Sequence, residues 1–537
     1  MVLNRIDPTT NPFAGLDIPW LLQTQCQALG DKTLLTWAPF DAPPRAYAYR
    51  EFYDLVGRLA AGLKKRGVAP GDRILVHLEN CPEFLLSWFA LAELGAIAVT
   101  TNTRSAAPEL RYYIEHSGCS GAITQPSLTA VMDEAATGLK WVVVTDHNAA
   151  AEPSGAIAAD PADRFSFLLC SEPLSPRRQI EADPSRPIAV QYTSGTTSRP
   201  KGVLMTHANW LWAGRVGTTH EGLRSDDIHL IYGPLFHVNA LGYSFLPTLW
   251  AGASAVLQPR WSTSRFWSAA CEHRTTWCSM MLFAMKVLAQ TEPPPVQPFR
   301  VWGTGVSGLA VAERAGVHLM GWYGMTETIS HPITGFHDRY NEPGAMGRAA
   351  PEYGVRVVDD EGCPARYGEA GHLRILGVPG LSLFSEYLHN EAATREAFDE
   401  DGWFITGDRV VLLPNGTIRF SDRDKDMLKV GGENVSASEI ERIIAAVPGV
   451  AEVAVVAKPH PMLAEVPAAF VRLFEPATDQ TRQTIAAQIE HACVGALADF
   501  KRPREVIFVE EFPRANLNKI AKAQLRAQLA QVEGAAP

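Results

Sequence analysis

A hydroxyl- and glycine-rich segment at residues 192–202 contains the residue types that bind a polyphosphate. It reads Tyr-Thr-Ser-Gly-Thr-Thr-Ser-Arg-Pro-Lys-Gly and follows an apolar run that ends at Val190. Hydroxyl groups and consecutive backbone N–H groups can hydrogen-bond phosphate oxygens, and a lysine adds a mobile positive charge. The candidate phosphate-binding residues are Thr193, Ser194, Gly195, Thr196, Thr197 and Lys201. Because the lysine precedes its glycine, the segment is not a P-loop, and taken alone it is equally typical of a polar turn.

A second candidate site lies at residues 322–327, which read Trp-Tyr-Gly-Met-Thr-Glu. An aromatic ring can stack on adenine, a hydroxyl can bond a phosphate oxygen, and a carboxylate can hold Mg²⁺. Taken alone, these residues are equally typical of a turn with a buried aromatic side chain.

Three further segments carry charged residues in positions that could serve the same chemistry. The first reads Trp-Phe-Ile-Thr-Gly-Asp and ends at Asp408, a carboxylate just past a β run that suits two ribose hydroxyls. The second, residues 422–434, has the appearance of a solvated charge run. The third, residues 512–519, ends at Lys519, whose flexible stem could bridge a carboxylate and a phosphate.

Together these segments resemble the motifs of the adenylate-forming superfamily, which contains acyl-CoA ligases, adenylation domains of peptide synthetases and luciferases. The usual phosphate loop of that superfamily is [ST]-S-G-[ST]-T-G-x-P-K-G, and Ser198 replaces its second glycine here. This change is similar to the carnitine/crotonobetaine–CoA ligase branch. The resemblance covers roughly residues 30–525.

The resemblance implies a role for each matched residue of the nucleotide site. Tyr323 packs on adenine, with Trp322 and Gly324 beside it in the motif. Thr326 contacts the α-phosphate and Glu327 ligates Mg²⁺, and both count as catalytic. Asp408 holds the ribose, and Arg423 contacts the ribose or a phosphate.

The resemblance also implies a moving C-terminal part. Lys425 corresponds to the hinge, and Lys519 to the lysine that promotes adenylation. A hairpin from Lys429 to Glu433 presents Lys429 to the site, and Gly431 and Gly432 line a tunnel for CoA. The chain departs from the family pattern at three positions, since Asp422 and Asn518 replace glycines and Ala515 replaces threonine.

An acyl pocket is implied by two further segments. Gly-Pro-Leu-Phe-His-Val, ending in His237 and Val238, matches the family's P-x-F-H segment, although a lone histidine in an apolar run is more often a core residue. Residues 301–305 stand where relatives pack glycines against the acyl group, so Gly303 and Gly305 are assigned there, together with Met325. Trp302 is unusual at its position and is expected to shorten or cap the pocket.

Composition limits the class of protein. The 537 residues suffice for two or more domains, and the net charge of −10 disfavours nucleic acid as a partner. The N-terminus has no signal-peptide pattern, and no apolar stretch approaches the ~18 residues of a spanning helix. The eight cysteines form no C-x-x-C pair, which favours a reducing cytoplasm without structural zinc or disulfides.

Alternating strand-like and helix-like segments predict an α/β fold with a largely parallel sheet. Examples are a helix over Tyr49–Arg66, then strands over Arg73–Leu78 and Gly121–Thr124. Shorter β runs after Val355 predict a β-rich subdomain. The resemblance implies a large N-terminal domain of βαβ-layered sheets at residues 1–422 and a small, mobile α+β domain at residues 423–537.

The resemblance therefore implies a Mg²⁺- and ATP-dependent ligase that joins a small-molecule carboxylic acid to coenzyme A through an acyl-adenylate, whereas the spacing alone would give only a nucleotide-binding α/β protein. Two alternatives remain at this point. A stand-alone adenylating enzyme could pass its carboxylate, or another oxyanion, to a carrier protein or a different nucleophile. A non-catalytic nucleotide sensor would be expected to lack Lys519 or Glu327, and both are present. Homodimers are common among the relatives, and no membrane contact is expected.

Overall fold

A computed structural model describes residues 11–149, 160–175, 177, 180–193, 200–423, 426–430, 433–460, 463–497, 499–514 and 520–534. The chain forms two compact units. The first contains residues 1–193, 200–355 and 375–404, and the second contains residues 194–199, 356–374 and 405–537. The β-rich segments before residue 422 thus belong with the C-terminal residues by their contacts, whereas the sequence grouped them with the N-terminal domain. The hinge at Lys425 stays a prediction.

The first unit contains a seven-stranded sheet in the order β18-β8-β7-β4-β3-β5-β6. The five strands from β7 to β6 are parallel, and β8 and β18 add an antiparallel edge. In chain order the strands are β3 Arg73–His77, β4 Ile97–Thr100, β5 Gly121–Thr124, β6 Val142–Val144, β7 Pro187–Thr193, β8 Lys201–Thr206 and β18 Glu386–Tyr387.

A nine-stranded sheet, in the order β15-β14-β13-β12-β11-β9-β10-β1-β2, forms the other layer of strands in the first unit. Its six central strands are parallel, which confirms the largely parallel pattern expected from the sequence. The strands are β1 Thr33–Trp37, β2 Arg45–Ala48, β9 Ile228–Ile231, β10 Ser254–Leu257, β11 Trp277–Ser279, β12 Val301–Thr304, β13 His318–Tyr323, β14 Ile333–Thr334 and β15 Arg348–Ala349.

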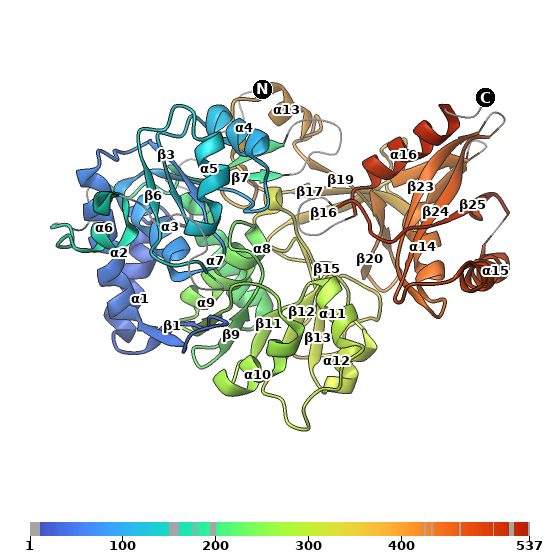
Figure 1. The fold of residues 1–537 in the computed structure, drawn as a ribbon, viewed down its shortest axis with the longest axis horizontal. Helices are drawn as coiled ribbons and strands as arrows, with labels where there is room; N and C mark the ends of the chain where they lie inside the picture. Colours follow the sequence, from blue (N-terminus) through green and yellow to red (C-terminus); the bar gives the residue numbers. More distant parts are fainter. Residues whose placement is uncertain are drawn as a thin grey trace. The chain divides into compact units, whose positions relative to one another are not determined.

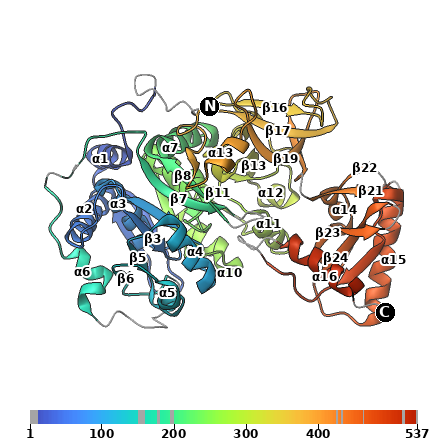
Figure 2. The ribbon, with the colours of Figure 1, turned by 90° about the horizontal axis from the view of Figure 1, so that it is seen from above.

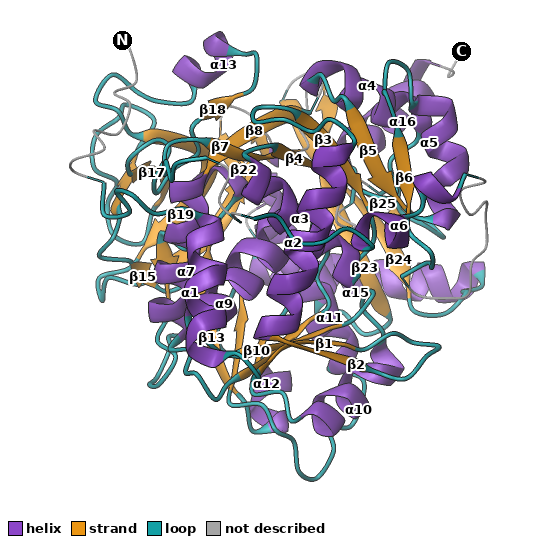
Figure 3. Ribbon diagram, turned by 90° about the vertical axis from the view of Figure 1, so that its left-hand side faces the viewer, coloured by secondary structure: helices purple, strands orange, loops and turns teal. Residues whose placement is uncertain are grey.

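Helices fill the space between these two sheets (Figure 3). They are α1 Ile18–Leu29, α2 Tyr49–Lys65, α3 Pro82–Leu94, α7 His207–Glu221, and α8 Val238–Ala240, which continues through a π-helical turn, Leu241–Phe245, into α9 Leu246–Trp250. Every residue of α3 except Glu83 is buried, because a helix between two sheets has no face left for water. Trp88 of α3 meets Trp210 of α7 edge-on, with ring centroids 5.3 Å apart.

Other helices cover the outer faces of both sheets (Figure 2). The seven-stranded sheet packs against α4 Ala107–Ser117 and α5 Thr129–Ala135, with the short α6 Phe165–Leu169 near α2. The nine-stranded sheet packs against α10 Thr263–His273, α11 Leu282–Leu288 and α12 Ala310–Ala315. The last helix of this unit is α13 Glu391–Glu396. The layers confirm the α/β class predicted from the alternating pattern.

Two further sheets complete the chain (Figure 1). One has four strands in the order β16-β17-β19-β20, with β19 and β20 antiparallel, and the other has five strands. The four strands are β16 Gly354–Val358, β17 Ala370–Leu376, β19 Phe404–Leu412 and β20 Ile418–Arg423. The five are β21 Met427–Val430, β22 Glu433–Ser436, β23 Val450–His460, β24 Ala464–Leu473 and β25 Glu505–Phe508. Helices α14 Ala437–Ala445, α15 Asp479–Ala496 and α16 Lys522–Gly534 pack on that sheet. Ser436 caps α14, and its Oγ accepts a hydrogen bond from the Glu439 N–H.

Candidate active site

A β-hairpin holds both ends of the predicted phosphate loop. Strand β7 ends at Thr193 and β8 begins at Lys201, and these two residues are cross-strand partners in the antiparallel register. The hydroxyl of Tyr112 donates to the Pro200 carbonyl at 3.0 Å and helps to fix the entry to β8. Ser194, Gly195, Thr196 and Thr197 lie outside the described residues, so their assignment stays a prediction. The hairpin geometry places Lys201 at the carboxyl end of β7, where ligands of parallel sheets bind.

The Tyr-Gly-Met-Thr-Glu segment forms a tight turn after β13. Gly324 is required here, because a Cβ atom would lie 2.6 Å from the Tyr243 Oη and 2.7 Å from the Ser330 carbonyl oxygen. Tyr323 is buried, and its hydroxyl lies 3.5 Å from the Met325 sulfur. Thr326 begins the short 3₁₀ turn Thr326–Thr328 and is partly exposed. Three residues after Thr326, Ile329 has a φ of +64°, which is unusual for a β-branched residue and points to a constrained turn.

Glu327 and Lys201 meet at a third residue, Tyr387. The Tyr387 hydroxyl donates a hydrogen bond to Oε1 of Glu327 at 3.0 Å, and both side chains are buried. The Lys201 ammonium lies over the Tyr387 ring, 4.4 Å from its centroid. The structure thus brings together two residues that the sequence predicted in separate motifs. Tyr387 itself was not predicted, because its contacts come from strand pairing between distant segments and no local spacing signals them.

The segment predicted as the acyl-pocket wall also contacts this region. His237 caps the short helix α8, which starts at Val238, and its ring lies 4.4 Å from that of Phe236. The following π-helical turn carries Tyr243, whose hydroxyl donates to the Met325 carbonyl at 3.1 Å. A π-helical turn is rare and frequently occurs at functional sites. The structure therefore places Met325 beside the π-helical turn that follows α8, and the acyl-pocket roles of His237, Val238 and Met325 stay predictions.

Trp302 has a different place from the one expected. Its side chain is fully buried and packs against Phe266, Trp267 and Phe299 on the outer side of the nine-stranded sheet. Successive residues of a strand point to opposite faces, so Trp302 points away from the face that Gly303 occupies. The expectation that Trp302 caps the acyl pocket is not supported, because the surrounding core already fills the space around its ring.

Gly303 and Trp322 are packed against each other inside the first unit. A Cβ atom at position 303 would lie 2.1 Å from Cζ3 of Trp322. The Trp322 ring stacks on Trp277, with centroids 5.6 Å apart, and on His331 at 4.4 Å. Burial lowers the pKa of His331 well below its usual range, so this imidazole is neutral. Trp322, predicted to lie beside the nucleotide, is a member of this aromatic stack. Gly305, by contrast, has open space within 4 Å of its would-be Cβ.

In the second unit, Asp408 and Arg423 are cross-strand partners on β19 and β20. Asp408 is buried, and its backbone N–H donates to the Thr406 Oγ1 at 3.1 Å. Gly407 has a φ of +71°, which explains the glycine of the Thr-Gly-Asp segment. Asp408, predicted to hold the ribose, and Arg423, predicted to contact the ribose or a phosphate, therefore share one register position, and their roles stay predictions.

The predicted hairpin after the hinge is present in the second unit. Lys429 on β21 pairs with Asn434 on β22, and Val430 pairs with Glu433. Gly431, Gly432 and the hinge residue Lys425 lie outside the described residues. The roles of Lys429 and of the two glycines stay predictions.

The segment that leads to Lys519 is anchored at both ends, although residues 515–519 lie outside the described part of the chain. Arg514 and Ile520 form an antiparallel bridge, and the Ala521 N–H donates to the Pro513 carbonyl at 2.8 Å. The Arg514 guanidinium donates to both oxygens of Glu452, at 2.8 and 2.7 Å. Burial acts to raise the pKa of Glu452, but the hydrogen bonds and charges of Arg514 and Arg472 outweigh it and lower that pKa.

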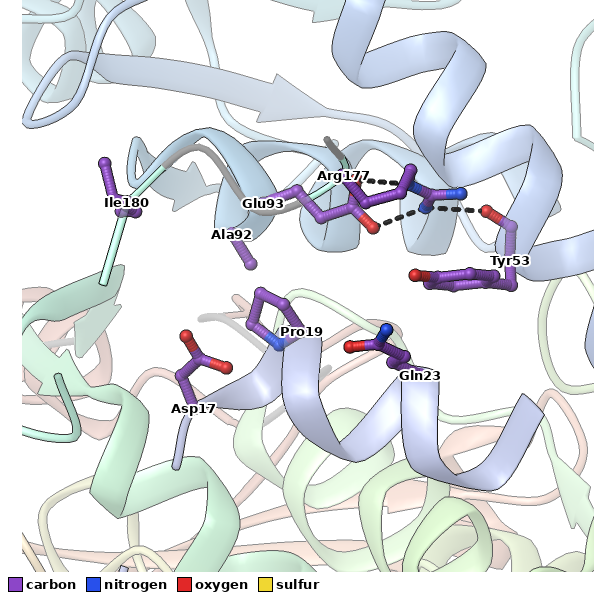
Figure 4. A pocket seen from close by; sticks show the side chains of 8 residues that line it. All are labelled: Asp17, Pro19, Gln23, Tyr53, Ala92, Glu93, Arg177 and Ile180. Atoms are coloured by element: carbon purple, nitrogen blue, oxygen red, sulfur yellow. Dashed lines mark hydrogen bonds and ion pairs between the residues drawn. The ribbon is translucent and has the colours of Figure 1, made fainter. Parts of the chain in front are cut away.

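A small pocket of the first unit lies among α1, α2 and α3, away from these motifs in the sequence (Figure 4). Arg177 reaches into it and forms an ion pair with the buried Glu93, at 2.5 Å, and donates to the Tyr53 carbonyl at 2.9 Å. Its guanidinium also lies 3.8 Å from the Tyr53 ring centroid. These contacts fasten residue 177 to the helical layer and indicate a structural role.

Among the described residues, no group of three or more His, Cys, Asp or Glu side chains could hold a metal ion. A Mg²⁺ ion bound through Glu327 would therefore take most of its remaining ligands from phosphates and water, as Mg²⁺ commonly does. None of the described helices has both the length and the apolar character needed to cross a membrane. All eight cysteines lie in the described part of the chain, and each is a free thiol there.

Two family models match the chain. Residues 22–388 match the AMP-binding enzyme family, and residues 439–519 match the AMP-binding enzyme C-terminal domain. The chain belongs to the AMP-binding enzymes. This adenylate-forming family is the one that the phosphate-loop and Tyr-Gly-Met-Thr-Glu motifs resemble, so the resemblance drawn from the sequence is confirmed.

Curated relatives in this family are crotonobetaine/carnitine–CoA ligases. The protein from Salmonella paratyphi A is 31% identical over 524 residues, which cover 95% of this chain and 99% of the relative. The protein from Escherichia coli O7:K1 is 32% identical over 511 residues, covering 93% and 96%. The branch suggested by Ser198 is therefore also found among the relatives.

Solved structures of the family share the fold. The anthranilate CoA ligase AuaEII, in complex with anthranoyl-AMP, superposes with a TM-score of 0.86 at 24% identity, over 98% of this chain and 100% of that one. ATP-bound MatB from Rhodopseudomonas palustris gives a TM-score of 0.81 at 26% identity, over 95% and 99%. These likenesses confirm the predicted α/β architecture.

Proposed function

We propose that the chain is an ATP-dependent acyl-CoA ligase that activates a carboxylic acid as its adenylate and then transfers the acyl group to coenzyme A. The observation that carries the proposal is the convergence of Lys201 and Glu327 on Tyr387. It places a cation from the phosphate-loop hairpin and a carboxylate from the Tyr-Gly-Met-Thr-Glu turn on one side chain. A phosphate group and its counter-ion need both kinds of partner.

In the first step a carboxylate oxygen of the acid attacks the α-phosphorus of ATP. The bond to the bridging oxygen breaks, and pyrophosphate leaves with the electron pair. Lys201 would hold the leaving phosphates, Thr326 would hydrogen-bond the α-phosphate, and Lys519 would orient the carboxylate against it. Glu327 is the carboxylate that would hold Mg²⁺, which supplies charge neutralisation for the phosphates when bound.

By the resemblance, Tyr323, Asp408 and Arg423 are the candidates for binding the nucleoside half of ATP. Tyr323 ends strand β13 at the motif turn and offers its ring to adenine. Asp408 and Arg423, paired on β19 and β20, would bind the ribose. A carboxylate accepts two hydroxyl donors at once, which suits a cis-diol.

In the second step the thiol of coenzyme A attacks the acyl carbonyl of the adenylate, and AMP leaves with the electron pair of the broken carbon–oxygen bond. Gly431 and Gly432, which link β21 to β22 in the sequence, would let the pantetheine chain pass close to the backbone. Replacement of Lys519 by this hairpin through rotation about Lys425 would let one site serve both steps. We infer a cytoplasmic enzyme from the eight unpaired cysteines.

Release of AMP and pyrophosphate, measured with ATP and Mg²⁺ across a panel of carboxylic acids, tests the proposal. The panel includes carnitine and crotonobetaine, short and long aliphatic acids, and aromatic acids, each with and without coenzyme A. We expect AMP release that depends on one class of acid and rises many-fold when coenzyme A is present. Acid-dependent pyrophosphate formation that ignores coenzyme A would assign the second step to a carrier protein or another nucleophile. Absence of acid-dependent pyrophosphate formation would overturn adenylation itself.

A further inference from the structure

Tyr387 lies where three separate segments of the first unit meet. It belongs to the two-residue strand β18, which forms the antiparallel edge of the seven-stranded sheet next to β8 (Figure 3). Tyr387 is the register partner of Val203, two residues from Lys201 along β8. Side chains two apart on a strand share a face, so Lys201 and Tyr387 lie diagonally across the pair on the same side of the sheet.

The hydroxyl of Tyr387 is directed at the carboxylate of Glu327. The distance from Oη to Oε1 is 3.0 Å, and the two residues are 6% and 5% exposed. A phenolic hydroxyl that faces a carboxylate acts as the donor, and a hydrogen bond to a buried carboxylate is among the stronger ones.

The segment that carries Tyr387 is itself held firmly. Backbone hydrogen bonds join Ser385 N–H to the Leu204 carbonyl at 2.9 Å and Leu388 N–H to the Gly202 carbonyl at 2.8 Å. The Phe384 N–H donates to the Glu327 carbonyl at 2.8 Å, so the same segment also grips the backbone of the residue whose side chain Tyr387 contacts. The Tyr387 N–H donates to the Thr394 Oγ1 at 2.9 Å. Tyr387 is thus a rigid support and not a mobile side chain.

We propose that Tyr387 is a positioning residue that holds Glu327 for Mg²⁺ through its hydroxyl and holds Lys201 for the phosphates through its ring. This inference rests on the proposed function, because it takes the roles of Glu327 and Lys201 from it. The two contacts use different parts of one side chain, and they can therefore be removed separately.

The donor set around Glu327 fits this role. A carboxylate has about four lone-pair positions, so a bond from Tyr387 leaves capacity for a metal ion while fixing the rotation of the group. Hydrogen-bond partners of metal ligands orient those ligands, and their loss lowers metal affinity about 10- to 100-fold. The aromatic face attracts the Lys201 ammonium and restricts an otherwise flexible four-carbon stem.

Binding of ATP without any acid substrate tests the two contacts apart from turnover. Tyr387→Phe removes only the hydroxyl, and Tyr387→Leu removes the hydroxyl and the ring. Titration calorimetry with ATP in EDTA reports on the phosphate contacts. Titration of Mn²⁺ into the enzyme–ATP mixture, followed by electron paramagnetic resonance, reports on the metal.

We expect Tyr387→Phe to bind ATP in EDTA within about twofold of the parent and to bind Mn²⁺ about 10-fold or more weakly. Tyr387→Leu should also weaken ATP binding in EDTA several-fold, because Lys201 loses its ring. The matched control is Tyr49→Phe, which removes another buried phenol bond, from Oη to the Ala253 carbonyl at 2.7 Å, outside the site. Its Mn²⁺ and ATP affinities should equal those of the parent.

Unchanged Mn²⁺ affinity in Tyr387→Phe would overturn the role of the hydroxyl, and equal ATP binding in EDTA by Tyr387→Phe and Tyr387→Leu would overturn the role of the ring. If Tyr387→Leu does not fold, the Mn²⁺ affinity of Tyr387→Phe still tests the role of the hydroxyl. ATP binding in EDTA by Lys201→Met then tests the phosphate contact, and the same several-fold loss is expected. Failure of the proposed function looks different. In that case the parent enzyme shows no acid-dependent pyrophosphate release, whatever Tyr387 does.

Discussion

The ring of Trp322 occupies the space in which a side chain at position 303 would have to lie. A Cβ atom built on Gly303 would be 2.1 Å from Cζ3 of Trp322 and 2.5 Å from Cη2 of Trp277. Gly303 is therefore a packing requirement of the aromatic stack that Trp277, Trp322 and His331 form. Since Tyr323 follows Trp322 directly on β13, the position of the stack also sets the position of the predicted adenine-binding ring.

We expect Gly303→Ala to lower stability and to weaken ATP binding together. The methyl group must displace Trp322, and overpacking of a buried site typically costs about 1–3 kcal/mol. Thermal unfolding and calorimetric ATP titration measure the two effects. Gly305→Ala is the matched comparison, because its would-be Cβ meets nothing within 4 Å. It should leave the melting temperature unchanged, and a similar loss of stability in both variants would contradict the packing argument.

Local patterns predicted much of the fold because they depend on neighbouring residues. The apolar spacing over Tyr49–Arg66 predicted a helix that the structure has at Tyr49–Lys65, and Gly121–Thr124 is a strand at the predicted bounds. The start of helix α15 at Asp479 has no such signal, because its first turn is polar and carries no apolar period. Strand β8, between the phosphate loop and α7, was also missed.

Long-range pairing explains what the sequence could not predict about the site. Tyr387 and Glu327 are 60 residues apart, and their contact depends on β18 pairing with β8. Trp302 is a different case, since the alternation of side chains along β12 is enough to place it on the other face of the sheet from Gly303. The expectation that Trp302 caps the acyl pocket was based on the motif at residues 301–305 and did not consider the alternation of side chains along the strand. The revised expectation is that Trp302→Gly opens a cavity in the core and destabilises the protein.

Replacement of Lys519 should separate the two half-reactions. In Lys519→Ala we expect acid-dependent pyrophosphate release to fall by two orders of magnitude or more, because the cation that bridges carboxylate and α-phosphate is lost. Thioester formation from a supplied acyl-adenylate should remain near the parent rate. Lys522→Ala is the control, since that lysine pairs with Glu441 at 2.8 Å on the same domain. Equal damage to both half-reactions in Lys519→Ala would remove Lys519 from its assigned role.

The ion pair between Arg177 and Glu93 should contribute to stability and not to catalysis. The Glu93 side chain is only 4% exposed, so Arg177→Met leaves a buried charge unpaired, at a cost of about 3 kcal/mol. The double variant Arg177→Met/Glu93→Gln should recover part of that loss, because no charge remains buried. Urea unfolding at neutral pH measures both. A double variant less stable than the single one would show that Glu93 does not carry the cost.

Glu452 should make the stability of the second unit depend on pH in the acid range. Its pKa is lowered in the folded state, since Arg514 and Arg472 outweigh the effect of burial. The carboxylate therefore stabilises the fold above the ordinary glutamate pKa of about 4.3, and this contribution is lost as pH falls through the lowered folded value.

Glu452→Gln lacks this contribution, so it should be less stable than the parent at pH 7 and should lose less stability on acidification. Urea unfolding followed at pH 7 and at several values below about pH 4.3 measures the difference. Glu505→Gln serves as the control, because Glu505 is 41% exposed and contacts a single lysine, Lys458. Exposed ion pairs of this kind contribute little to stability, so the loss of stability of Glu505→Gln on acidification should follow that of the parent. Parallel profiles for Glu452→Gln and the parent would show that the two guanidinium groups do not hold the Glu452 carboxylate as the structure indicates.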